Sequence, residues 1–341
     1  MKKLFFALMA GLALWSNAVS AQIDKVDEWK KNLNLEDKDT VAWIYGGQLN
    51  LGINQALLHN WAAGGELASA QVSGIFAGFL TRVNHNKLWS NNLDMAYGLS
   101  YLYSNSFVPV KLDDRLDFTS KYGIRSNRMK RLYLTGLFNF RTQFTKGYDY
   151  KLPNWQKYPI SDFLSPAYLT LALGAEYRIG EMFSVFYSPI AAKMTFADSH
   201  YTNMYPEGAF GIENGKTFRF ELGSYLSARY KVDITKQIFY RTRLDLYSNY
   251  LAKDVKDTAG IVVKRDNPGN IDVLFDNFIG IKLGKFISVA VGVTMVYDND
   301  YPYSKTYLTP DGVKIDKNEP AAGLGWWQMK QIMNVGFSYK L

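Results

Sequence analysis

The amino-acid sequence predicts an all-β protein, a transmembrane up-and-down antiparallel β-barrel of about twelve strands. Three observations support this prediction. Apolar and polar residues alternate with a period of two, the alternating segments are longer than ordinary strands, and short connections alternate with long ones. After the first 21 residues there is no apolar run of about 20 residues, which excludes a polytopic helical membrane protein.

The composition agrees with a chain that lies at a boundary between an apolar and a polar environment. Apolar residues make up 48% of the chain and aromatic residues 16%, yet the mean hydropathy is only −0.18. The chain has no Cys, so we expect neither a disulfide nor a thiolate metal site. The formal charge of +8 fits a surface near anionic lipid, and export makes a nucleic-acid partner unexpected.

The N-terminal residues 1–21 are expected to be a signal peptide. Two lysines precede an apolar run, Leu4–Trp15, that is too short to span a bilayer, and a small-residue cleavage site ends at Ala21. Residues 22–40 are predicted to be a short periplasmic segment, with apolar residues at helical spacing. The barrel is expected to occupy residues 41–341.

Alternation is clearest in residues 217–233. Phe218 and Phe220 fall on one face of this segment, and Arg219 and Glu221 fall on the other. A globular strand has about 5 to 6 residues, whereas a strand that crosses a bilayer at a tilt needs about 9 to 11. The same pattern predicts strands at 41–57, 66–83, 87–104, 112–125, 130–145, 164–179, 182–193, 216–233, 237–250, 269–283, 286–298 and 327–341. The register is unclear in the second and the seventh of these.

The connections alternate between tight turns and long loops, as in an up-and-down sheet with all long loops on one side. A soluble barrel would turn its apolar face inward, whereas a transmembrane barrel turns it toward lipid. Export, strand length and an even strand count favour the second arrangement. Aromatic residues at the strand ends, with Phe239 among those near the short turns, are expected to form two belts at the membrane interfaces.

The charged face of each strand is therefore expected to line the lumen. Arginines on two adjacent strands, Arg219, Arg229, Arg241 and Arg243, form a candidate cluster that would favour anions in a narrow channel. The alternative is that charges of both signs pair across strands and fill the interior. Twelve strands lie between barrels that side chains just fill and barrels that keep a channel, and the long charged side chains favour the filled interior.

The chain also resembles a known family. The stretch Asn60-Trp61-Ala62-Ala63-Gly64-Gly65 at the first long connection, followed by barrel strands, resembles an uncharacterised outer-membrane β-barrel family of Bacteroidota that has only a domain-of-unknown-function label. The resemblance implies an outer-membrane location and a barrel fold. It makes Asn60, Trp61, Gly64 and Gly65 a candidate outer-loop binding motif, and it supplies no catalytic residue. The last strand resembles the recognition strand of outer-membrane barrels, which implies insertion by the bacterial assembly machinery.

Candidate catalytic residues are few. A phospholipase or lipid A deacylase needs a Ser and a His within hydrogen-bond reach, and Ser199 and His200 are adjacent in a predicted loop, which is poor geometry. His59 and His200, or acidic residues of the last long loop such as Asp298, could hold a metal ion but lack the spacing of calcium loops. We therefore expect no metal site and no cofactor.

The sequence as a whole predicts a non-enzymatic protein of the bacterial outer membrane. It would act as a narrow pore or in a structural or surface-interaction role, with a lipid-acting hydrolase as the alternative. Expected partners are outer-membrane lipid and lipopolysaccharide, the assembly machinery during insertion, and a small solute or a glycan. Aromatic loop residues, Tyr148, Tyr150, Trp155, Tyr201 and Tyr205, are the candidates for binding a glycan or a protein.

Overall fold

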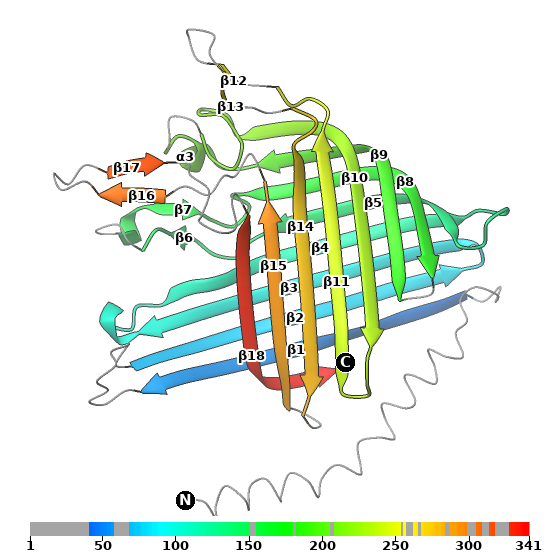
Figure 1. Cartoon of the computed structure of the whole chain (residues 1–341), viewed down its shortest axis with the longest axis horizontal. Helices are drawn as coiled ribbons and strands as arrows, with labels where there is room; N and C mark the ends of the chain where they lie inside the picture. Colours follow the sequence, from blue (N-terminus) through cyan, green and yellow to red (C-terminus); the bar gives the residue numbers. More distant parts are fainter. Residues whose placement is uncertain are drawn as a thin grey trace, which may run out of the picture.

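The computed structural model describes twelve strands that form one closed antiparallel barrel (Figure 1). Each strand pairs with its sequence neighbours among these twelve, and the last pairs with the first, so the predicted up-and-down fold class is confirmed. The described residues are 41–57, 68–150, 155–179, 182–204, 208–253, 255–256, 262–264, 267–283, 287–298, 305–308, 314–317 and 327–340. The expected signal peptide and the segment 22–40 lie outside them.

Each of the twelve predicted segments overlaps one barrel strand. The strands are β1 (Val41–Leu57), β2 (Ala68–Asn84), β3 (Lys87–Leu102), β4 (Val110–Arg125), β5 (Leu132–Thr142), β8 (Ala167–Ile179), β9 (Phe183–Phe196), β10 (Phe218–Asp233), β11 (Ile238–Asn249), β14 (Ile271–Lys282), β15 (Ile287–Tyr297) and β18 (Gln328–Lys340). The shortest has 11 residues and the longest 17, so each can cross a bilayer at a tilt.

The long connections contain small elements that the sequence did not predict. Figure 1 shows them beyond the strand ends, on the side away from the short turns. They are the strand pairs β6 (Gly147–Tyr148) with β7 (Pro159–Ser161), β12 (Val255–Lys256) with β13 (Val262–Lys264) and β16 (Lys305–Leu308) with β17 (Lys314–Lys317), and the helices η1 (Tyr103–Asn105), η2 (Trp155–Lys157) and α3 (Ser199–Thr202). Among the described residues, no helix is long and apolar enough to cross a membrane.

The two faces of the strands are distributed as predicted, with apolar residues outside and polar residues inside. In β10, Phe218 and Phe220 are 44% and 48% exposed, whereas Glu221 and Ser227 are 2% and 1% exposed. One residue of the predicted aromatic belt is wrongly assigned. Phe239 is buried inside the barrel, where Arg241 and Lys282 lie over its ring.

Strand β9 changes phase at Pro189, which explains its unclear register. Phe186 and Ser188 are buried, then Pro189 and Ile190 are both exposed, and Ala191 is buried again. The pairing with both neighbouring strands shifts at this point, as expected for a β-bulge. Proline suits the extra position because it has no N–H to donate to the ladder. Beyond the bulge the odd-numbered residues face inward.

Strand β2 has an unclear register for a different reason, because both of its faces carry large apolar residues. Val72 and Leu80 are exposed on the outside, and Val83 is buried on the inside. Ile75 and Phe79 share the inner face with Val83. Alternation of polarity therefore does not show clearly which residues of this strand face inward, although the backbone pairing is regular along its whole length.

The barrel closes where β18 meets β1, over the five register pairs from Gln48 with Lys340 to Gly52 with Gly336. The neighbouring ladder between β1 and β2 has seventeen such pairs. The closing strands approach tightly, and a Cβ atom on Gly336 would overlap the carbonyl oxygen of Leu51. A glycine is therefore required at this position for the strands to pair.

Candidate functional site: the bridged lumen

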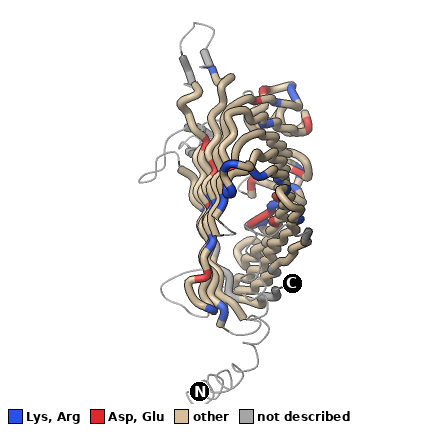
Figure 2. The backbone as a smooth tube through the Cα atoms, turned by 90° about the vertical axis from the view of Figure 1, so that its right-hand side faces the viewer, with Lys and Arg blue, Asp and Glu red and all other residues tan. Residues whose placement is uncertain are grey.

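The inward residues of the barrel bring basic and acidic side chains together across the lumen. Figure 2 shows basic and acidic positions on both sides of the barrel interior. Because an isolated buried charge is costly, each needs a partner or a polar ligand. The described charges lie in several groups at different heights along the strands.

The central group joins β4 to β11, which have four strands between them on the shorter way around the ring. Nη1 of Arg243 lies 3.3 Å from Oδ2 of Asp117, and its Nη2 lies 2.6 Å from Oδ2 of Asp245. Asn139 donates to Asp117 at 2.6 Å, and Ser227 donates to Asp245 at 2.7 Å. Both carboxylates are buried and hydrogen-bonded, so this group holds opposite walls together.

A second group joins β4 to β8. Nζ of Lys121 donates to Oε1 of Glu176 at 3.0 Å, and both residues are buried. The ammonium lies 5.2 Å from the ring centroid of Phe186, which is fully buried. A paired charge against an aromatic face fills this part of the interior.

A third group lies nearer the long connections, between β9 and β14. Nζ of Lys193 lies 3.1 Å from Oδ2 of Asp272 and 3.6 Å from Oε2 of Glu221. Glu221 also accepts hydrogen bonds from Arg219 and Asn249, each at 3.1 Å. A single lysine thus links strands that have two others between them.

A fourth group lies at the mouth of the barrel on the long-connection side. Nζ of Lys330 on β18 donates to Oδ1 of Asp113 on β4 at 2.9 Å. The neighbouring Asp114 accepts from the backbone N–H groups of Phe144 and Thr145 at 2.7 and 3.0 Å. These contacts fasten the chain that leaves β5 to the rim of β4.

The candidate arginine cluster is only partly brought together. Arg229 and Arg243 are directly opposite each other on β10 and β11. Arg241 lies over Phe239, with a ring distance of 5.1 Å. Arg219 donates instead to the carbonyl oxygen of Gly211 at 3.0 Å and to Glu221, in the third group.

Three lumen arginines keep unused donors. The Nε atoms of Arg115, Arg229 and Arg241 are buried and have no hydrogen-bond partner within the described structure. Asp94, on β3, interacts electrostatically with Arg115 and Arg229. The lumen therefore combines tight ion pairs with guanidinium groups that can still donate.

Sequence reasoning missed several members of these groups. Lys193 was missed because the bulge at Pro189 reverses the faces of β9, and a proline within a strand was the available signal. Lys330, Asp113 and Asp114 lie near strand ends, where alternation gives weak evidence. Each of these three forms an ion pair in the structure.

The outer-loop motif cannot be placed, because Asn60, Trp61, Gly64 and Gly65 lie outside the described residues. His59 and Tyr205 lie outside them as well. The structure therefore does not place the side chains of the motif that carries the family resemblance.

The candidate hydrolase residues lie in and beside α3. Asp198 caps this helix and accepts from the backbone N–H of His200 at 2.7 Å. The His200 ring packs edge-on against Tyr201, with centroids 5.1 Å apart. The carbonyl oxygen of Ser199 accepts from Thr202 Oγ1 at 3.3 Å. These contacts stabilise a short helix and do not assemble a nucleophile with its base.

The described residues contain no group of three or more His, Cys, Asp or Glu side chains arranged to hold a metal ion. Of the proposed loop ligands only Asp298 and His200 are described, and the others lie outside the described residues.

The aromatic loop residues pack on one another. The Trp155 ring lies 4.9 Å from the Tyr148 ring and 4.8 Å from the Tyr150 ring, both edge-on. The Tyr150 hydroxyl accepts from the backbone N–H of Lys111 at 3.0 Å. Tyr201 is buried and donates to Asp162 at 3.4 Å. These contacts hold the rings within two different long connections, so less ring surface is left for a ligand.

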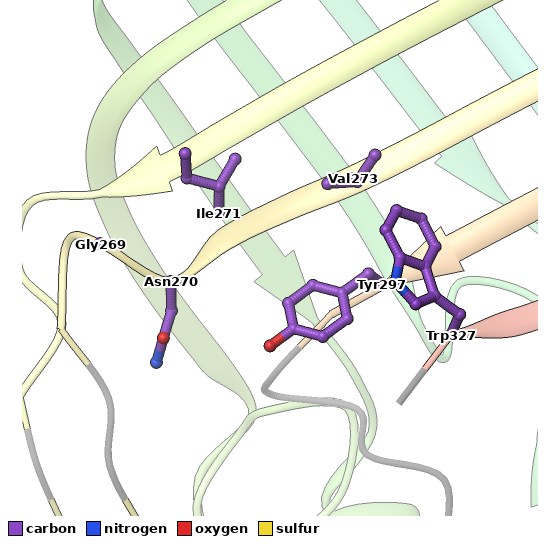
Figure 3. Close-up of a pocket in the computed structure, with 6 residues that line it drawn as sticks. All are labelled: Gly269, Asn270, Ile271, Val273, Tyr297 and Trp327. Carbon is purple, nitrogen blue, oxygen red and sulfur yellow. The ribbon is translucent and has the colours of Figure 1, made fainter. Parts of the chain in front are cut away.

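A shallow pocket of about 290 Å³ lies on the outer surface near the long connections, as Figure 3 shows. Ile271, Val273, Tyr297 and Trp327 line it, with Gly269 and Asn270 at its edge. The Tyr297 and Trp327 rings are 5.6 Å apart. Ile271 and Val273 belong to the outward face of β14 and Tyr297 to that of β15, and Trp327 directly precedes β18. The pocket therefore faces the surroundings of the barrel and not its lumen.

Comparison with known proteins gives one family match. Residues 53–148 match a family model described as a protein of unknown function (DUF3078). A search of curated proteins gives no match.

Several solved structures are similar to this chain at low sequence identity. The translocator domain of the autotransporter NalP from Neisseria meningitidis has a TM-score of 0.36 and 9% identity, over 95% of this chain and 98% of that one. An outer membrane channel from Pseudomonas putida F1 has a TM-score of 0.35 and 9% identity, over 91% and 98%. OmpT, an outer membrane protein of Vibrio cholerae, has a TM-score of 0.30 and 7% identity, over 89% and 99%.

Proposed function

We propose that the chain is a β-barrel protein of the bacterial outer membrane, without enzymatic activity, whose lumen is held closed by ion pairs. Its role is then structural, or is carried by its loops at the surface. The apolar outer face supports membrane insertion, with outer-membrane lipid and lipopolysaccharide around it and the assembly machinery acting during insertion.

The observation that carries the closed lumen is the contact of Arg243 with Asp117, which joins opposite walls at 3.3 Å. An open channel would leave lumen charges solvated and its walls apart. Lys193 with Asp272 and Lys330 with Asp113 add further links at other heights. Ion pairs thus cross the interior at several heights, and the side chains that form them fill the lumen.

Single-channel recording in a planar bilayer tests this proposal. The unmodified protein is expected to give no discrete conductance at moderate salt. The double variant Asp117→Ala with Arg243→Ala removes both side chains of the central link and is expected to give current steps. Discrete steps of the same size from both proteins would exclude the closed lumen.

A narrow anion pore is the second candidate, favoured by the unpartnered Nε atoms of Arg115, Arg229 and Arg241. Under this candidate the unmodified protein conducts, and its reversal potential in a salt gradient favours anions. Arg229→Gln is then expected to lower the anion preference, and Lys236→Gln, at an exposed short turn, is expected to leave it unchanged. A cation preference in the unmodified protein would exclude this candidate.

A further inference from the structure

Arg82 is a basic residue on the outer face of the barrel. It shares the outward face of β2 with Val72 and Leu80 and is itself exposed. It lies two residues before the end of β2, beside the short turn to β3. An outward Arg is strongly destabilising at the centre of a bilayer and is tolerated near its surface. Its place near the strand end therefore corresponds to the level of the lipid headgroups.

Two tryptophans flank Arg82 in the sheet. The register places it directly between Trp43 of β1 and Trp89 of β3. Its Cζ atom lies 5.3 Å from the centroid of the Trp43 ring, and the two Trp rings meet edge-on at 6.2 Å. Trp89 Nε1 donates to Ser120 Oγ at 3.0 Å, which fixes its ring. Among the described residues Arg82 donates no hydrogen bond and forms no ion pair.

A second cation lies close by on the same face. Lys87, the first residue of β3, is exposed and shares the outward face of this strand with Trp89. Lys87 is thus a diagonal neighbour of Arg82, at a spacing of about 7–8 Å in antiparallel sheets. The chain has no acidic residue between Glu66 and Asp94, so these strands place no carboxylate beside the two cations.

We propose that Arg82, Lys87, Trp43 and Trp89 bind the headgroup of an anionic phospholipid in the leaflet on the short-turn side. The guanidinium offers paired N–H donors to two phosphate oxygens, and Lys87 attracts the same anion as a point charge. The Trp rings lie at the boundary between headgroups and acyl chains, where such rings are favoured. The site rests on insertion into a membrane and is independent of the state of the lumen.

Native mass spectrometry tests this site. The barrel is released from vesicles of equimolar phosphatidylglycerol and phosphatidylcholine, and the ratio of the two lipids that stay bound to it is measured. The unmodified protein is expected to retain phosphatidylglycerol in excess. Arg82→Gln should lower that ratio about fivefold, since a basic residue near a membrane surface contributes about 1 kcal/mol. Arg82→Lys should have an intermediate effect because it keeps the charge and loses the planar donors. Lys87→Gln should also lower the ratio.

Lys236→Gln, at the exposed turn between β10 and β11, serves as the matched control. An unchanged ratio in Arg82→Gln would overturn the site. An equal loss in Lys236→Gln would also overturn it, because it would indicate a general attraction to positive charge. Circular dichroism of each variant in vesicles reports insertion separately. A protein that forms no β-structure in vesicles would contradict the proposed function, whereas a folded barrel without lipid preference contradicts the headgroup site alone.

Discussion

The guanidinium of Arg243 lies 3.3 Å from the carboxylate of Asp117, although 126 positions of the chain separate them. The contact exists because the ring order brings β4 and β11 to nearly opposite sides of the barrel. Both groups are largely withdrawn from solvent and have further hydrogen-bond partners. Each therefore stabilises the charge of the other in the interior.

Removing one partner of this pair should be strongly destabilising. Asp117→Ala leaves Arg243 with Asp245 alone, and breaking a buried pair costs about 3–5 kcal/mol. Urea unfolding of the barrel in vesicles, followed by tryptophan fluorescence, measures the change. Glu213→Gln is the control, because its pair with Lys216 is exposed, with side chains 75% and 62% accessible, and should matter by less than about 1 kcal/mol. Similar losses in both variants would contradict a stabilising link across the lumen.

The outer face can be tested at Leu226, near the middle of β10. Leu226→Arg should cost about 2–4 kcal/mol if this face meets lipid, because a cation at the bilayer centre is poorly solvated. Leu226→Met keeps the apolar surface and nearly the same volume, so it should cost less than about 1.5 kcal/mol. The same unfolding measurement in vesicles compares the two. If Arg and Met are tolerated alike, the outward face of β10 is not in hydrocarbon.

Tyr201 predicts a pH dependence at the long-connection end. Burial, and then the carboxylate of Asp162, raise the pKa of Tyr201 from 10.0 to about 12. The folded protein thus favours the neutral phenol, and this contribution to stability is complete below pH 10 and is lost as the pH rises through about 12. The stability difference between the unmodified protein and Tyr201→Phe should be constant below pH 10 and shrink above it. A difference that does not change with pH would refute this linkage.

The junction between β1 and β18 should be the first part of the ladder to open. Leu51 and Phe337 are register partners there, and both side chains point outward with 48% and 45% exposure. Because the chain has no Cys, the pair Leu51→Cys and Phe337→Cys can form one defined disulfide. Oxidation should raise the unfolding temperature of this variant.

The matched control for the junction is Leu49→Cys with Phe76→Cys, which links β1 to β2 in the longer ladder. Its disulfide should raise the unfolding temperature less, since that ladder does not separate first. Equal gains from the two disulfides would show that the junction is no weaker than its neighbour.

Most of the fold could be predicted from the sequence because period-two alternation and strand length directly reflect the two environments of a barrel wall. Strand β10 is the clearest case, with Phe220 outside and Glu221 inside. The method fails where the chain departs from strict alternation. The apolar residues on the inner face of β2 and the bulge at Pro189 weakened the signal in the two strands whose register is unclear from the sequence.

The partners across the lumen could not be predicted in the same way. Alternation states that Arg243 and Asp117 both face inward, but their contact depends on ring closure and on the stagger of the strands. Neither quantity is local in sequence. The four candidate arginines were therefore grouped by their nearness on two strands, whereas Arg219 pairs near the long connections and Arg243 pairs near the centre.

The extra residue at Pro189 sets which side chains of β9 face inward beyond it. Lys193 and Thr195 face inward there, and Met194 and Phe196 face outward. Because the bulge places one more residue on β9 than on the strands beside it, deleting Pro189 would leave a strictly alternating strand in which these four residues keep their faces. Pro189→Ala keeps the residue count and therefore the bulge. Both variants should therefore insert into vesicles, and a deletion variant that fails to insert would contradict this account of the bulge.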